Sequence, residues 1–293
     1  MQYSVGTPYP IFEDEYGKGV MIGEGAFAKV FACTRRGEKQ VYAVKEVDYS
    51  HLSEKYVDLY QFEARILTKL HHPNLAYIEC TFDDPVRQVW HTVMDLYDNG
   101  DVATMITQYR GAGMLIPEER VWEIFGQMVD VLAYLHRLYR TDVPSIHRIL
   151  HRNLRPDNIL LKSNGVIGLG TLRLGTEQTI NTNSTEAVGP LPYTAPEVLR
   201  HETYGPLCDA WSLGCIIAEI CTQQRVFDDP LVEMGSILPI KLRGYSKELE
   251  LLVNGLLDPY AGSRRSCTDI CDHPKFVEAR ARTVGKVAPL THV

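Results

Sequence analysis

Alternating apolar and polar positions in the first third of the chain predict β-strands. In GVMIGEGAFAKVFACT, residues 19–34, the alternation continues on both sides of a glycine-rich stretch and predicts a hairpin. The same pattern predicts a third strand in QVYAVKEV, residues 40–47, and two more in LAYIECTF, residues 75–82, and QVWHTVMDLY, residues 88–97. The beginning of the chain is therefore expected to form a sheet.

A longer period, close to 3.6 residues, predicts helices between and after these strands. The helix expected over residues 53–70 begins at the candidate cap Ser53, and its apolar stripe consists of Tyr56, Leu59, Tyr60, Ile66, Leu67 and Leu70. Residues 117–140 and 209–224 repeat the helical pattern. We therefore expect an α+β fold, with a small β-rich lobe that carries one main helix joined near residues 95–99 to a larger helical lobe.

Composition and charge narrow the functional classes. The 293 residues include 30 basic and 37 acidic side chains, and the net charge of −7 argues against a general binder of nucleic acid or anionic membranes. Seven cysteines lack the paired spacing of a zinc site or disulfide framework, so reduced thiols are expected. No uncharged apolar run approaches the length of a membrane span. We expect a cytoplasmic protein without membrane insertion.

Two charged residues fall where an unpaired charge would be costly. Lys45 lies between apolar neighbours in a predicted strand, and Glu63 falls in the apolar stripe of the following helix. Taken singly, Lys45 is explained by a solvated edge position and Glu63 by a surface charge pattern. Taken together, the two residues explain each other as an ion pair. Gly23 and Gly25 lie in the preceding hairpin, where a simple glycine turn is the alternative to a phosphate-binding loop.

These features occur in the order typical of a known family. GEGAFAKV, residues 23–30, resembles the glycine-rich loop of eukaryotic protein kinases, and Lys45 and Glu63 resemble the lysine–glutamate pair. YTAPEVL, residues 193–199, and CDAWSLGC, residues 208–215, resemble the end of the activation segment and the helix after it. HHPNL, residues 71–75, and VMDLYDNGDV, residues 93–102, are similar to segments of the NIMA-related (NEK) serine/threonine kinases.

The resemblance implies a bilobal protein-kinase fold over residues 15–280. It implies an N-lobe over residues 15–94, a hinge over 95–99 and a C-lobe over 100–280, with an N-terminal extension at 1–14 and a tail or linker at 281–293. It also implies that Glu197 pairs with Arg264 and that Asp209 and Trp211 fall at the buried Asp-x-Trp of the family. The positions that would contact ATP are Ile22, Gly23, Gly25, Val30, Ala43, Lys45, Glu63, Met94, Asp95, Tyr97 and Leu160, with Met94 as gatekeeper.

The catalytic loop departs from the family pattern His-Arg-Asp-Leu-Lys-Pro-x-Asn. In HRNLRPDN, residues 151–158, Asn153 replaces the catalytic aspartate, Arg155 replaces the lysine, and Asn158 retains the metal-binding asparagine. An amide is nearly isosteric with a carboxylate but is no useful proton acceptor. The sequence therefore predicts a loop that folds without its general base.

The metal site departs as well. Counting thirteen residues from Asn158, the family spacing, reaches Thr171 in place of the aspartate of Asp-Phe-Gly. Magnesium prefers carboxylate and phosphate oxygens, so no metal site is expected, Asn158 is the residual candidate ligand, and magnesium binding is expected to be weak or absent. Pro190 further replaces a threonine of the substrate platform.

The replacements at Asn153, Thr171 and Pro190 all affect the same phosphate-transfer reaction. Together they favour a degenerate NEK-like kinase, a pseudokinase that acts as a scaffold or allosteric regulator. An active Ser/Thr kinase that transfers the γ-phosphate of ATP to protein hydroxyls at a low rate is the alternative. Metal-independent ATP binding and a pocket closed by side chains both stay open. The resemblance implies protein partners, such as an active kinase or a cytoskeletal protein, and a cytoplasmic setting that extends to the cytoskeleton; oligomeric state is left open.

Two surface segments each allow two interpretations. TEQTINTNSTEA, residues 176–187, is either a phosphorylation target whose phosphate would reach Arg152 or a solvated loop. RLYRTDVPSIHRI, residues 137–149, is either a partner surface or a passive insertion.

Overall fold

The computed structural model describes residues 12–17, 19–25, 28–67, 70–137, 139–140, 146–170, 176–179 and 185–284, without the side chains of residues 55, 59, 62–66, 139–140, 146–147, 176–179 and 283–284. The chain divides into two compact units. The first comprises residues 1–71 and 76–97, and the second comprises residues 72–75 and 98–293. The boundary after Tyr97 falls inside the segment that the sequence analysis assigns to a hinge.

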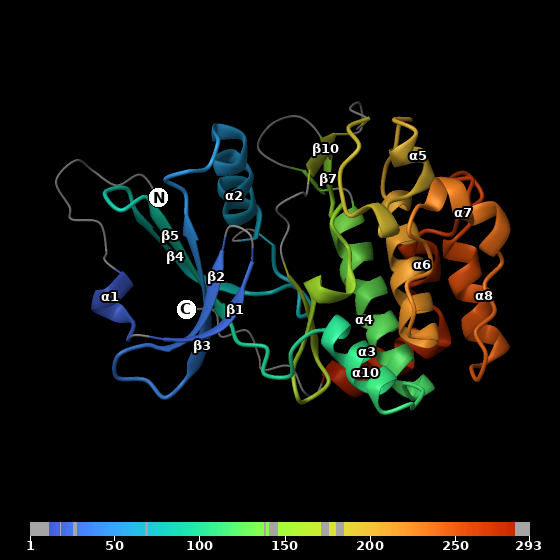
Figure 1. The fold of residues 1–293 in the computed structure, drawn as a ribbon, viewed down its shortest axis with the longest axis horizontal. Coiled ribbons are helices and arrows are strands. Elements are labelled where there is room, and N and C mark those ends of the chain that lie inside the picture. Colours follow the sequence, from blue (N-terminus) through green and yellow to red (C-terminus); the bar gives the residue numbers. More distant parts are fainter. Residues whose placement is uncertain are drawn as a thin grey trace. The chain divides into compact units, whose positions relative to one another are not determined.

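The first unit contains a five-stranded antiparallel sheet in the order β1-β2-β3-β5-β4 (Figure 1). Each predicted strand is present, and the helix α2 begins one residue after Ser53. The sequence pattern was wrong at Tyr56, which is 41% exposed, whereas Tyr60 and Leu67 are buried. The elements are β1 (Val20–Glu24), β2 (Lys29–Thr34), β3 (Val41–Asp48), α2 (Glu54–Leu67), β4 (Ile78–Asp84) and β5 (Val89–Asp95).

A short N-terminal helix, α1 (Phe12–Glu15), packs on one face of this sheet. The Phe12 ring stacks on His91 at a centroid distance of 4.2 Å and on Tyr16 at 5.2 Å. The core beneath it consists of Tyr16, Cys33, Tyr42, Val44, Phe82 and Val93. Phe12, which the sequence analysis assigns to an extension, therefore covers the core of the first unit.

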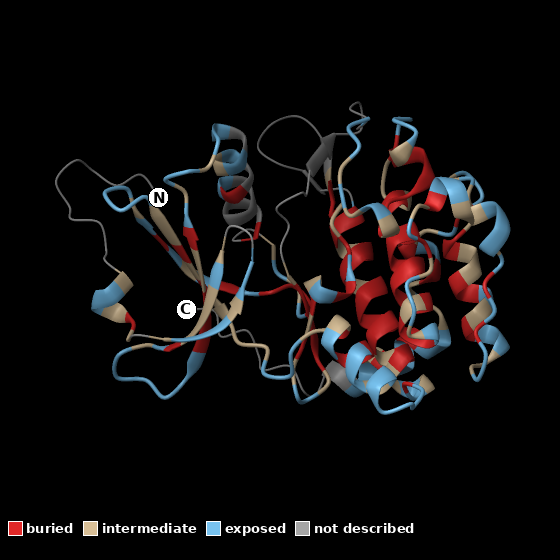
Figure 2. Cartoon of the chain, in the orientation of Figure 1, coloured by how far each residue is buried: buried red, intermediate tan, exposed pale blue. Residues whose placement is uncertain are grey.

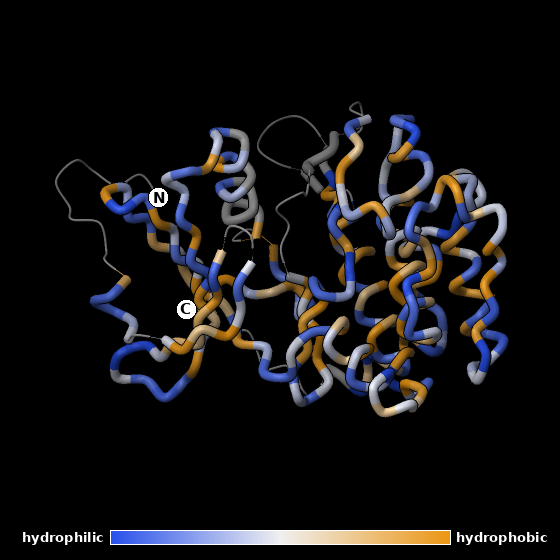
Figure 3. The backbone as a smooth tube through the Cα atoms, in the orientation of Figure 1, coloured by the Kyte–Doolittle hydropathy of each residue, from blue (hydrophilic) through white to orange (hydrophobic). Residues whose placement is uncertain are grey.

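The second unit is mainly helical. Its centre is formed by α4 (Glu118–His136) and α6 (Leu207–Thr222), which are buried along most of their length (Figure 2). Figure 3 shows the matching hydropathy, with hydrophobic residues in these inner helices and hydrophilic residues on the turns. The other helices are α3 (Val102–Gly111), α5 (Pro196–Leu199), α7 (Pro230–Ile237), α8 (Lys247–Leu256), α9 (Cys267–Ile270) and α10 (Pro274–Val284), with 3₁₀ turns η1 (Pro156–Asn158) and η2 (Leu191–Tyr193).

Two small sheets lie in the same unit. One pairs β8 (Ile159–Leu161) with β9 (Ile167–Leu169), and the other has the order β10-β7-β6, where β6 is Tyr139–Arg140, β7 is Ile146–Leu150 and β10 is Thr176–Thr179. The helix predicted over residues 117–140 was therefore too long. It ends at His136, because Arg137 turns to an extended backbone and β6 satisfies its backbone groups by pairing with β7.

These elements match the α+β fold expected from the sequence. Among the described residues, no helix combines the length and the apolar character needed to cross a membrane.

Candidate functional site

Within the first unit, strand pairing places the predicted adenine-contacting residues on one face of the sheet. Val30 lies opposite Lys45, and Ala43 lies opposite Met94. Directly opposed residues point to the same face, and so do residues two positions apart on one strand, such as Ala43 and Lys45. The four side chains therefore share the face opposite the core on which α1 packs.

The glycine-rich turn and the residues after β5 belong to the same unit. The N–H of Gly25 donates to the carbonyl of Ala28 at 2.8 Å and closes the turn between β1 and β2. Ile22 is 51% exposed beside Gly23. The backbone N–H of Asp95 donates to Tyr77, at 3.2 Å, and Tyr97 is half-buried.

Lys45 points toward α2. Its Nζ lies 5.2 Å from the centroid of the Tyr60 ring, a cation–π distance. Tyr60 and Glu63 are three residues apart, so they lie on the same side of the helix. The Glu63 side chain is outside the described residues, and the Lys45–Glu63 ion pair stays a prediction.

In the second unit, a buried carboxylate holds the catalytic loop. Asp209, at the start of α6, accepts hydrogen bonds from the backbone N–H groups of His151 and Arg152, both at 2.9 Å, and lies 2.8 Å from His136 Nε2. Arg152 has φ of 60°, a left-handed conformation that is uncommon for a non-glycine residue, and the Asp209 hydrogen bonds hold the backbone in it. Burial alone would raise the pKa of the Asp209 carboxyl, but these hydrogen bonds outweigh burial and lower it.

Hydrogen bonds between residues of the catalytic loop hold its backbone in place. Asn158 Nδ2 donates to the carbonyl of Asn153 at 2.7 Å, and the N–H of Asn153 donates to His151 Nδ1 at 3.2 Å. The side-chain amide of Asn153 makes no hydrogen bond with any described residue. Arg155 pairs with Asp157, two residues away on the loop. The loop is thus folded, with an amide at the predicted catalytic position.

Leu160 and the strand before Thr171 connect to this loop. Leu160 lies on β8 opposite Gly168 of β9, and the N–H of Gly170 donates to the Asn158 carbonyl at 2.9 Å. The predicted metal position Thr171, together with the residues up to position 175, falls outside the described residues. The structure therefore brings Asn153, Asn158 and Leu160 together and does not place Thr171.

The segment before α5 packs directly on the catalytic loop. A Cβ at Gly189, whose φ is +111°, would lie 2.6 Å from the Arg152 carbonyl, so only glycine fits there. An Arg152 nitrogen donates to the Tyr204 hydroxyl at 3.1 Å, and that hydroxyl donates to the Glu186 carbonyl at 2.8 Å. Tyr204 lies in none of the sequence motifs, and only its contact with Arg152 identifies it.

The predicted Glu197–Arg264 pair is confirmed. Two Arg264 nitrogens donate to the two carboxylate oxygens of Glu197 at 2.6 and 3.0 Å, and the guanidinium lies 5.1 Å from the ring of Trp211. Arg264 also donates to the carbonyls of Leu207 and Asp258. This pair ties the segment after the substrate platform to the C-terminal helices.

The predicted magnesium donors can be described only in part, because Thr171 lies outside the described residues. The described ligand candidate is the neutral Asn158 amide, and its neighbour Asn153 is neutral as well. Among the described residues, no group of three His, Cys, Asp or Glu side chains could hold a metal ion.

The role of Asp209 can be tested by Asp209→Asn. An amide cannot accept from both backbone N–H groups and from His136, so the free energy of unfolding should fall by about 1–3 kcal/mol at neutral pH. Because the folded pKa lies below the ordinary 3.8, the stabilisation is fully present above that value and is lost as the pH falls through the folded pKa. Urea unfolding from pH 7 to acid should show the two proteins converging, while the exposed control Asp228→Asn should match the wild type throughout. A constant difference at all pH values would contradict this role.

The comparisons with known proteins agree with this architecture. The profile of the "Protein kinase domain" family matches residues 16–276. Human serine/threonine-protein kinase Nek2 is 27% identical over 92% of this chain and 61% of its own length. Human Nek5 is 28% identical over 90% of the chain and 37% of its own length.

Mouse serine/threonine-protein kinase 36 is 30% identical over 92% of the chain and 20% of its own length. The chain thus spans between about a fifth and three fifths of the relatives it matches. The matches to several Nek kinases confirm the resemblance seen in the motifs. The chain belongs to the eukaryotic protein kinase family, and the Nek kinases are among its relatives.

Proposed function

We propose that this chain is a pseudokinase, a kinase fold that binds other proteins and does not transfer phosphate. The observation that carries the proposal is the catalytic loop, where Asn158 still holds the backbone of position 153 in place while the side chain there is a neutral amide. A positioned general base contributes about 10²- to 10⁴-fold in rate. Thr171, at the aligned metal position, removes a second carboxylate.

A slow Ser/Thr kinase is the second candidate. It is favoured by the kinase names of the relatives and by the retention of Lys45 and Asn158. In this view Lys45, Glu63, Arg155 and Asn158 would sustain transfer from ATP to a protein hydroxyl. The ion pair of Arg155 with Asp157 weighs against it, because the arginine that replaces the phosphate-steadying lysine already has an anionic partner.

A radiolabelled ATP assay on the purified chain, with Lys45→Met as a matched control, separates the two functions. The pseudokinase proposal expects equal, background labelling of a protein substrate by both proteins. Labelling by the wild type that the Lys45 substitution abolishes would establish the enzyme instead.

We further propose that any nucleotide binds without a metal. Val30, Ala43 and Met94 offer an apolar surface for adenine and Lys45 a charge for phosphate, whereas the magnesium donors are neutral. Arg173 would add positive charge near the phosphates, a position that lies outside the described residues. ATP should therefore raise the melting temperature equally with magnesium and with a chelator, and a shift that requires magnesium would contradict this. If ATP does not change the melting temperature under either condition, the result would favour a nucleotide pocket that is closed by side chains.

The expected partner is a protein, such as an active kinase or a cytoskeletal protein, in a cytoplasmic setting that extends to the cytoskeleton. This proposal is supported by the kinase fold, in which Asn153 and Thr171 replace the catalytic and metal-binding aspartates, and by the similarity to Nek kinases. A pull-down with the whole chain, followed by identification of the bound proteins, tests this. Recovery of no specific protein would count against a scaffold.

A further inference from the structure

A four-residue segment of the chain belongs to a different unit from the residues that flank it. Residues 72–75 lie in sequence between α2 and β4, which are parts of the first unit, but they group with the second unit. Anything that holds this segment therefore acts on the chain connection between α2, which carries Glu63, and β4.

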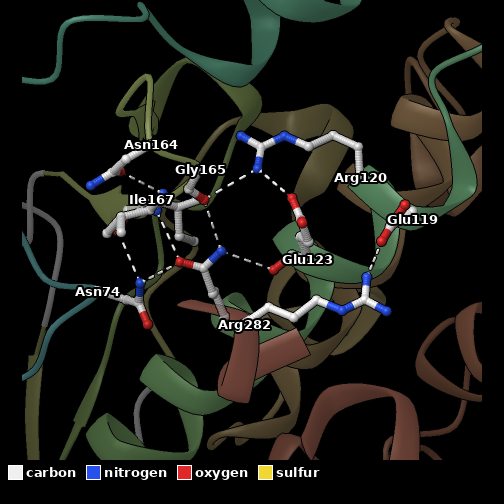
Figure 4. Close-up of polar contacts among 10 residues, drawn as sticks. Asn74, Glu119, Arg120, Glu123, Asn164, Gly165, Ile167 and Arg282 are labelled. Atoms are coloured by element: carbon white, nitrogen blue, oxygen red, sulfur yellow. Dashed lines mark hydrogen bonds and ion pairs between the residues drawn. The ribbon is translucent and has the colours of Figure 1, made fainter. Parts of the chain in front are cut away.

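Asn74 is the first anchor of this segment. It is buried, and its amide donates to Gln127 Oε1 at 2.8 Å and to the Ile167 carbonyl at 3.0 Å (Figure 4). Gln127, which is 1% exposed on α4, also accepts from the Ile167 N–H and donates to the Gly165 carbonyl. The segment is thus joined to α4 and β9 by a satisfied buried network.

His72 is the second anchor, and it leads to the C-terminal helix. His72 Nδ1 accepts the Asn74 N–H at 3.1 Å, and its Nε2 lies 3.3 Å from Asp130 on α4. The other oxygen of Asp130 accepts from Arg280 of α10 at 2.7 Å, and Arg280 also donates to the Cys271 carbonyl. Burial alone would raise the pKa of Asp130, but His72 and Arg280 together lower it, so the carboxylate stays charged between its two partners.

A second arginine of α10, Arg282, serves as a control for Arg280. Arg282, two residues further along α10, pairs with Glu119 and Glu278, and all three side chains are 42–69% exposed. Figure 4 shows Arg282 reaching Glu119 on α4. Arg282 thus links the same two helices, but among the described residues no hydrogen bond or ion pair joins it to Asp130 or to residues 72–75.

We propose that α10 controls the α2–β4 connection through the relay Arg280–Asp130–His72. When α10 is seated, the relay fixes His72 and, through it, the backbone of Asn74. A partner or modification that unseats α10 releases the connection and loosens α2. This inference holds whether or not the chain transfers phosphate.

Hydrogen exchange measured by mass spectrometry on the full chain tests the relay. Arg280→Ala should raise exchange about 5- to 10-fold in peptides covering residues 72–75 and α2, because both open more often once the anchor is lost. Arg282→Ala should leave those peptides at the wild-type rate. Asp130→Asn, which keeps the size of the side chain, should reproduce the Arg280→Ala result.

The double variant Arg280→Ala with His72→Ala adds a measure of coupling. If the residues act in series, its effect on α2 should equal that of His72→Ala alone rather than the sum of the two. The proposal would be overturned if Arg280→Ala left the exchange of residues 72–75 or of α2 at the wild-type rate. It would also be overturned if the effects of Arg280→Ala and His72→Ala on exchange were additive, or if Arg282→Ala raised exchange as much as Arg280→Ala.

Discussion

Restoring both missing carboxylates, with Asn153→Asp and Thr171→Asp in one chain, is expected to raise phosphate transfer to at least about 10²-fold above the wild-type background and to make that transfer depend on Lys45. The catalytic loop is already folded for the first substitution, because Asn158 Nδ2 and His151 Nδ1 bond the backbone of position 153 rather than its side chain. The second substitution supplies the anionic oxygen that magnesium prefers. The double variant would then hold both the proton acceptor and the metal ligand.

The measurement is the initial rate of radiolabelled phosphate transfer to a generic protein substrate. Each single variant should stay near background, because one carboxylate cannot substitute for the other, and Lys45→Met in the double variant should abolish the gain. A double variant that binds magnesium and ATP but stays at the wild-type rate would show that more than these carboxylates is missing. Pro190 of the substrate platform is then the next position to restore.

The features that could be predicted from sequence are those set by local pattern or by ordered motifs. The strands β1 to β5 follow from alternation, and the pairing of Glu197 with Arg264 follows from the resemblance to the family. The direction of Lys45 toward α2 follows from the cost of an unpaired charge among apolar neighbours.

The features that could not be predicted depend on contacts between distant residues. The sequence pattern of residues 117–140 predicts one continuous helix, but residues 139–140 form the strand β6. This strand exists because it pairs with β7, and the local pattern of apolar and polar residues gives no sign of that pairing. Tyr204 and Arg280 read as ordinary surface residues, and only their contacts with Arg152 and Asp130 give them a role. A buried amide such as Gln127 in an apolar helix was the one local signal that could have pointed to such a network.

The largest expected loss of stability comes from Arg264→Ala, which should lower the free energy of unfolding by about 3–5 kcal/mol. The Arg264 side chain is fully buried and the Glu197 side chain is 6% exposed, so the substitution leaves an unpaired carboxylate out of water and also removes the donors to Leu207 and Asp258. Urea unfolding followed by circular dichroism measures the change, with the exposed neighbour Arg265→Ala as control. The double variant Arg264→Ala with Glu197→Gln should recover part of the loss, because it removes the stranded charge. An Arg264→Ala protein as stable as the control would mean that the pair only orients the platform and does not hold the fold together.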